Sequence, residues 1–141
     1  MKKISKNEIT AVILAGGQAS RMDGEDKGLI VFRELPLISH VINITKPKVS
    51  QILISANRNF EEYANFGKVI SDDLEGYQGP LAGISKALKV CSTPYLLVLP
   101  CDSPLIDAAL IDSLIEKMEV SNVDICVAHD SSIMHATFAL M

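Results

Sequence analysis

The chain has 141 residues, of which 48% are hydrophobic and 21% charged, so it can bury a core and is not expected to be disordered. Aromatic residues make up only 5%, Trp is absent and the formal net charge is −4, which argues against a binder of nucleic acid or of anionic membranes. The length suits one domain, residues 1–141, and the first 35 residues, with six basic against five acidic residues, favour an anionic ligand near the N-terminal end.

Short apolar runs alternate with helical patterns along the chain. The predicted strands cover residues 9–14, 49–56, 68–71, 95–99, 123–128 and 135–141. The predicted helices cover residues 36–45, 60–66, 80–90 and 107–119, and residues 15–27 form a long loop. This alternation predicts an α/β fold with a mostly parallel sheet and helices on both faces. Ligands of such sheets bind beyond the carboxyl ends of the strands.

The thiols and the N-terminus indicate where the protein works. Cys91, Cys101 and Cys126 are odd in number and lack C-x-x-C spacing, which favours reduced thiols and a cytoplasmic protein. Neither a signal peptide nor an apolar run of membrane-spanning length is expected. Cys101 has no base placed beside it by the sequence, so we expect it to pack in the core.

The loop after the first predicted strand has the residues of a phosphate site. Gly16 and Gly17 allow backbone amides to approach an anion closely, and Arg21 and Lys27 can neutralise a polyphosphate. The loop is not a P-loop, because Gly28 follows Lys27, and the fingerprint G-x-G-x-x-G is absent. A solvated glycine loop with ordinary surface charges is the alternative for the glycine pair alone.

Carboxylates follow two later strands. Asp102, after the most apolar run, can hold Mg²⁺ or serve as a loop carboxylate, while Asp107 is the better N-cap for the helix that follows. Asp72 ends the third predicted strand, where it can initiate a turn with Asp73.

The string LAGGQASRMDGEDKG, residues 14–28, resembles the signature L-A-G-G-x-x-x-R-M-G-x-x-x-K-G of nucleotidyltransferases, and most closely that of the MobA-type molybdenum cofactor guanylyltransferases. Further segments resemble the family's motifs in the same order: residues 55–58, 69–72, 79–83, 100–104 and 135–140. The chain departs from the pattern at three positions, because Asp23 replaces a Gly, Ala136 replaces a Pro and Ser55 replaces a longer amide.

The resemblance implies the three-layer, Rossmann-like nucleotide-diphospho-sugar transferase fold with a mixed sheet. It also implies transfer of GMP from GTP to the phosphate of molybdenum-molybdopterin, which forms the guanine dinucleotide cofactor and pyrophosphate. The implied catalytic residues are Arg21, Lys27 and Asp102, and Asp102 would hold Mg²⁺. The implied nucleotide-binding residues are Leu14, Ala15, Gly16, Gly17, Lys27, Ser55, Asn57, Asp72, Gly79, Pro80, Gly83 and Asp102.

Several alternatives share this scaffold. They are cytidylyl transfer to the same cofactor, nucleotidyl transfer to a sugar phosphate, and nucleotide binding without activity. Members of the family continue beyond the point that matches Met141, so we expect the chain to be incomplete at its C-terminus. The resemblance is compatible with molybdoenzyme apoproteins or their chaperones as protein partners.

Overall fold

A computed structural model of the chain describes residues 3–15, 21–22, 25–71, 80–102, 107–129 and 134–141. Its centre is a six-stranded sheet with the order β7-β6-β1-β8-β10-β9. The strands of this sheet are β1 (Ile9–Leu14), β6 (Gln51–Ser55), β7 (Lys68–Ile70), β8 (Tyr95–Pro100), β9 (Cys126–His129) and β10 (Met134–Leu140). Only β10 runs against the others, because it pairs antiparallel with both β8 and β9. The predicted mixed, mostly parallel sheet is therefore confirmed.

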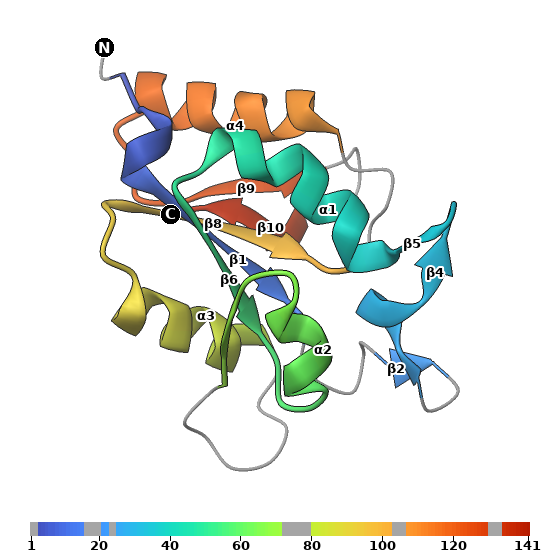
Figure 1. The fold of residues 1–141 in the computed structure, drawn as a ribbon. Helices are drawn as coiled ribbons and strands as arrows, with labels where there is room; N and C mark the ends of the chain where they lie inside the picture. The colour runs from blue at the N-terminus through green and yellow to red at the C-terminus, as the bar shows by residue number, and fades with distance from the viewer. Residues whose placement is uncertain (1–2, 16–20, 23–24, 72–79, 103–106, 130–133) are drawn as a thin grey trace.

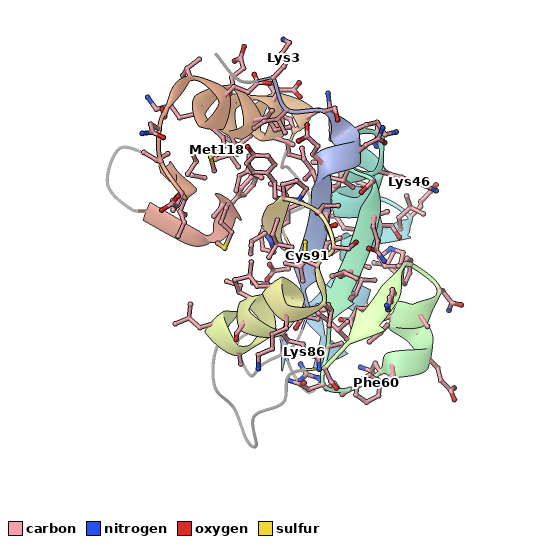
Figure 2. All side chains as sticks on the ribbon, turned by 90° about the vertical axis from the view of Figure 1, so that its left-hand side faces the viewer. Lys3, Lys46, Phe60, Lys86, Cys91 and Met118 are labelled. Carbon is pink, nitrogen blue, oxygen red and sulfur yellow. The ribbon has the colours of Figure 1, made fainter. Side chains whose placement is uncertain are left out.

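Helices cover both faces of the sheet (Figure 1). The helices are α1 (Leu37–Thr45), α2 (Phe60–Ala64), α3 (Pro80–Val90) and α4 (Ala108–Val120), with 3-10 turns η1 (Lys6–Glu8), η3 (Lys27–Leu29) and η4 (Lys46–Lys48). Helices α1 and α4 lie on one side and α3 on the other, and Figure 2 shows side chains filling both spaces, with Met118 of α4 and Lys86 of α3 on opposite sides. This is the three-layer architecture expected from the alternation of elements.

The central strand β1 explains why both faces need helices. All six of its residues are buried. Ile9, Ala11 and Ile13 belong to the core beneath α1 and α4, whereas Val12 and Leu14 belong to the core beneath α3. A strand buried on both faces is mostly apolar rather than alternating, as β1 is, and its one polar residue, Thr10, forms a hydrogen bond with the hydroxyl of Thr93.

Two small hairpins were not predicted. Strands β2 (Arg21–Met22) and β3 (Glu25–Asp26) pair inside the segment expected to be a loop. Strands β4 (Val31–Phe32) and β5 (Leu35–Pro36) pair around a two-residue turn. Arg33 and Glu34 in that turn have φ of 52° and 73°, the left-handed values that a type I′ turn requires. Because neither residue is Gly or Asn, the sequence has no turn signal there.

Several boundaries also differ from the prediction. Helix α1 begins at Leu37, one residue late, because Pro36 pairs in β5. Strand β9 begins at Cys126 rather than at residue 123, and Val123 and Ile125 before it are exposed. Strand β8 extends through Pro100, which pairs with Leu14.

Cys91, Cys101 and Cys126, which all lie among the described residues, form no disulfide. His40 of α1 contacts the carbonyl oxygen of Phe32 through Nε2 at 2.5 Å, which ties the helix to the β4–β5 hairpin. Within the described ranges, no helix has the length and hydropathy needed to cross a membrane.

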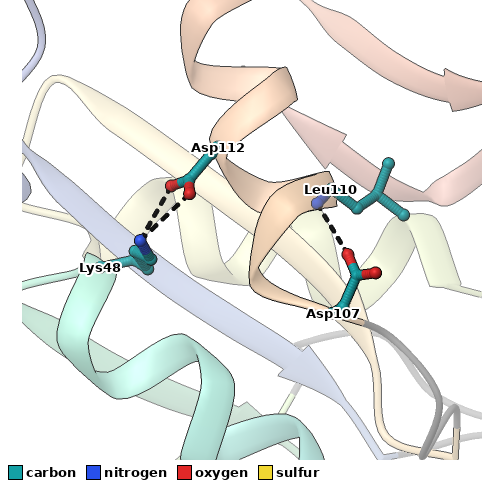
Figure 3. Close-up of polar contacts among 4 residues, drawn as sticks. All are labelled: Lys48, Asp107, Leu110 and Asp112. Atoms are coloured by element: carbon teal, nitrogen blue, oxygen red, sulfur yellow. Dashed lines mark hydrogen bonds and ion pairs between the residues drawn. The ribbon is translucent and has the colours of Figure 1, made fainter.

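Helix α4 is capped as the sequence predicts. Asp107 has extended backbone angles, and its Oδ1 accepts a hydrogen bond from the amide of Leu110 at 3.0 Å (Figure 3). One helical turn further on, Asp112 forms an ion pair with Lys48, in which Nζ and Oδ1 are 3.0 Å apart. The first contact satisfies an amide that the helix leaves unpaired, while the second is a surface ion pair.

We therefore expect Asp107→Ala to lower the free energy of unfolding by about 1 kcal/mol, because the amide of Leu110 loses its acceptor. Asp107→Ser should retain most of the stability, since Ser also caps helices. Asp112→Ala is the matched control and should cost less than about 0.5 kcal/mol. Urea unfolding followed by circular dichroism measures all three, and equal losses for Asp107→Ala and Asp112→Ala would contradict the capping role.

Candidate functional site

The carboxyl ends of four neighbouring strands lie level with one another. Leu14 of β1 pairs with both Ser55 of β6 and Pro100 of β8, and Ser55 pairs with Ile70 of β7. The ladder continues one residue further, because the amide of Ala15 donates to the carbonyl oxygen of Ser55 at 2.8 Å. The four chain segments that follow these strands therefore leave the sheet at one edge.

The level strand ends determine where four of the predicted site residues stand in the chain. Gly16, Asn57, Asp72 and Asp102 each stand two positions beyond one of the four paired residues. Asn57 is exposed and Asp102 is partly exposed at this edge. Gly16 and Asp72 lie outside the described residues, as do Gly17 and Gly79. The structure thus brings Asn57 and Asp102 to the predicted edge, and their contacts with a ligand stay predictions.

Lys27 and Asp102 face each other at the end of β8. The Nζ atom of Lys27 lies 3.9 Å from Oδ2 of Asp102, and each side chain keeps 33% of its surface exposed. An ion pair this open contributes only about 0–1 kcal/mol to stability. Its chemical value is that both groups remain accessible, the ammonium to phosphate oxygens and the carboxylate to a cation.

For Arg21, the structure describes the position of the backbone. Arg21 pairs with Asp26 across the β2–β3 hairpin, and Asp26 directly precedes Lys27. The hairpin therefore brings the backbones of the two predicted cationic residues into the same region. The direction of the Arg21 side chain is outside the described part of the structure.

Helix α3 approaches the edge from the other face of the sheet. Pro80 opens the helix, and its Gly83 packs directly on the strand ends. A β carbon at Gly83 would lie 2.5 Å from Oγ of Ser55 and 3.3 Å from Cδ2 of Leu14. Three of the predicted residues, Leu14, Ser55 and Gly83, are thus in contact. Ser55 is buried in this contact, and its predicted role toward a nucleoside stays a prediction.

One residue near the edge was not singled out from the sequence. Tyr63 of α2 is fully buried, and its hydroxyl lies beside Gly28, the residue that follows Lys27. Cys101, which precedes Asp102, contacts the same glycine and is buried, in agreement with its expected packing role. A tyrosine in a short helix has no local sequence signal for such a contact, because the contact forms only in the tertiary structure.

The donor set at this edge suits a hard divalent cation that needs few protein ligands. Among the described residues, no group of three or more His, Cys, Asp or Glu side chains could hold a metal. Asp102 offers a single accessible carboxylate instead. Mg²⁺ suits such a site, because it takes one or two protein carboxylates and fills its other positions with water and phosphate oxygens.

The chain is similar to known proteins both in sequence and in fold. Residues 11–140 match the family model of the MobA-like NTP transferase domain. A molybdenum cofactor guanylyltransferase of Shewanella sediminis is 51% identical over 124 residues, which are 87% of this chain and 63% of that protein. One from Polynucleobacter asymbioticus is 50% identical over 126 residues, covering 89% and 63%. The chain spans about 63% of the length of these curated relatives.

Two crystal structures have a similar fold. One is a protein of Aquifex aeolicus VF5, with a TM-score of 0.74 and 25% identity over 97% of this chain and 70% of the other. The second is molybdopterin-guanine dinucleotide biosynthesis protein A of Archaeoglobus fulgidus, with a TM-score of 0.71 and 20% identity over 93% of this chain and 66% of that one. At 20% identity, the similarity to the Archaeoglobus fulgidus protein shows that the two chains share a fold.

The close approach at Gly83 leads to a prediction about stability. Gly83→Ala should destabilise the protein by about 1–3 kcal/mol although Ala favours helix, because the new β carbon meets the Ser55 hydroxyl at 2.5 Å. Adding Ser55→Ala removes that oxygen and should restore most of the loss. Ser85→Ala, on the exposed side of the same helix, is the control for helix propensity. Thermal unfolding compares the four proteins, and a stable Gly83→Ala variant would contradict the packing.

Proposed function

The chain belongs to the family of MobA-like NTP transferase domains, and on that premise we propose that it transfers GMP from GTP to the phosphate of molybdenum-bound molybdopterin. The products are the guanine dinucleotide form of the cofactor and pyrophosphate. The observation that carries the reaction class is the accessible Lys27–Asp102 pair at the level ends of four strands. The relatives at about 50% identity, which are named molybdenum cofactor guanylyltransferases, support the choice of substrates.

In this proposal the nucleotide lies across the carboxyl edge of the sheet. The backbone of Gly16 and Gly17, which follow Leu14 and Ala15 at the end of β1, cradles the triphosphate, with Arg21 and Lys27 as its cations. The nucleoside contacts come from the segments after β6 and β7 and from the start of α3. These contacts involve Ser55, Asn57, Asp72, Gly79, Pro80 and Gly83. The Asp72 carboxylate would accept the two parallel donors of guanine, so that other bases leave polar groups unpaired.

The chemistry needs charge stabilisation more than proton transfer. An oxygen of the acceptor phosphate is already ionised at neutral pH, and it attacks the α-phosphorus of GTP. The bond from that phosphorus to the bridging oxygen breaks, and its electron pair leaves with pyrophosphate, so no base is required. The barrier comes from bringing two anions together, which the ammonium of Lys27 and the guanidinium of Arg21 offset.

Asp102 is the residue that would hold Mg²⁺ in this proposal. When bound, the ion supplies positive charge to the phosphate oxygens. Lys27 beside the same carboxylate places a second positive charge at the edge without occupying the exposed part of Asp102. We place the reaction in the cytoplasm, with molybdoenzyme apoproteins or their chaperones as recipients of the product.

Lys27→Ala should lower the rate of pyrophosphate release from GTP by about 100-fold or more, because a positioned cation is lost from the developing charge. The variant should fold normally, since a partly exposed ion pair contributes little to stability. Lys48→Ala removes a lysine from another surface ion pair, with Asp112, and serves as the control. Turnover near that of the wild type in Lys27→Ala would exclude the proposed role.

A substrate panel tests the reaction itself. GTP should release pyrophosphate in the presence of molybdenum-molybdopterin and Mg²⁺, and CTP, ATP and UTP should react more slowly by about 100-fold or more, the discrimination that paired polar groups give. Preference for CTP would assign cytidylyl transfer, and reaction only with a sugar phosphate would assign a different acceptor. Binding of GTP without pyrophosphate release would show that the chain binds the nucleotide but lacks transferase activity.

A further inference from the structure

Gly28 is enclosed by two buried side chains at the base of the site. A β carbon at Gly28 would lie 2.8 Å from the hydroxyl oxygen of Tyr63. It would also lie 3.2 Å from Sγ and 3.3 Å from the β carbon of Cys101. Tyr63 is 0% and Cys101 1% exposed, so neither side chain can move aside into solvent. The backbone at Gly28 therefore rests on a surface formed by these two residues.

The chain neighbours of these residues are the two charged groups of the site. Gly28 follows Lys27 in η3, and Cys101 precedes Asp102 at the end of β8. The contact between Gly28 and Cys101 thus joins the backbones that carry the ammonium and the carboxylate. Tyr63 comes from a third element, α2, and completes the surface from the side of β7.

We propose that Tyr63 and Cys101 are positioning residues, which set the distance between Lys27 and Asp102 by limiting how closely η3 approaches the end of β8. This inference rests on the proposed function for its kinetic consequence. Its geometric content, the separation of the two charged side chains, does not depend on which reaction the site performs.

In this proposal the hydroxyl of Tyr63 is the atom that limits how closely η3 approaches the end of β8. It is the nearest atom to the position of a β carbon at Gly28, closer than either atom of Cys101. Removing it leaves a gap beneath Gly28, and adding a methyl group at Gly28 creates a clash there. Either change displaces Lys27 relative to Asp102, and an error of about 1 Å in such an arrangement can cost about 100-fold in rate.

The first test removes only the oxygen. Tyr63→Phe should reduce kcat by about tenfold while KM for GTP changes by less than about twofold. The reason is that the variant misaligns Lys27 and Asp102 in the transition state but leaves the binding of GTP in the ground state unchanged. Tyr95→Phe, at the opposite end of β8, is the matched control and should have the kcat and KM of the wild type. Unchanged kcat and KM in Tyr63→Phe would overturn the proposal.

The second test asks whether removing the clashing atom restores kcat. Gly28→Ala should reduce kcat by about 100-fold. The double variant with Tyr63→Phe should recover about tenfold of that loss, because the closest clashing atom is gone. If both variants fold and the double variant is no more active than Gly28→Ala, Tyr63 does not act through Gly28. If Gly28→Ala does not fold, the kcat and KM of the single variant Tyr63→Phe decide whether the proposal stands.

A third measurement separates this proposal from the proposed function. Crystal structures of the wild type and the Tyr63→Phe variant give the distance from Nζ of Lys27 to Oδ2 of Asp102 without any substrate. A changed distance in the variant supports the positioning role even if the wild type releases no pyrophosphate from GTP, an outcome that would count only against the proposed function. An unchanged distance overturns the positioning role even if the wild type is an active transferase.

Discussion

The site depends on the register in which β1 pairs with its two parallel neighbours. Every backbone polar group in a strand buried on both faces must find a partner within the sheet, so the ladder leaves no freedom along the strand direction. A slip of one residue would turn the side chains of β1 to the opposite faces and would also separate Leu14 from Ser55 and Pro100. The level edge, and with it the position of Asp102 two residues beyond Pro100, follows from this register.

Two glycines then bring the surrounding elements close to the edge, one from each face of the sheet. Gly83 lets α3 rest on Ser55 and Leu14, and Leu14 belongs to the core beneath α3. Gly28 rests on Tyr63 and Cys101, and both of these belong to the core on the side of α1 and α4. The polar edge is thus supported by the packed cores, in which small displacements are costly.

The sequence predicted the parts of this molecule that depend on local pattern. Apolar runs such as residues 9–14 indicated the buried strands, and Asp107 was recognised as a helix cap because capping has a local signal. The β4–β5 hairpin was missed because Arg33 and Glu34 adopt left-handed angles without Gly or Asn. Tyr63 was missed for a different reason, since its proximity to Gly28 arises from a contact between distant segments. The pairing of Lys27 with Asp102 is likewise a tertiary property, although each residue was identified separately from its motif.

The measurement that tests the central claim most directly is a crystal structure with Mg²⁺ and guanosine 5′-(α,β-methylene)triphosphate, in which the bond that would break is replaced. We expect the triphosphate between Lys27 and the segment after β1, the metal ion on the Asp102 carboxylate, and the guanosine beyond the ends of β6 and β7. Binding of the nucleotide at the amino ends of the strands, or at this edge without contact to Lys27 and Asp102, would contradict the account.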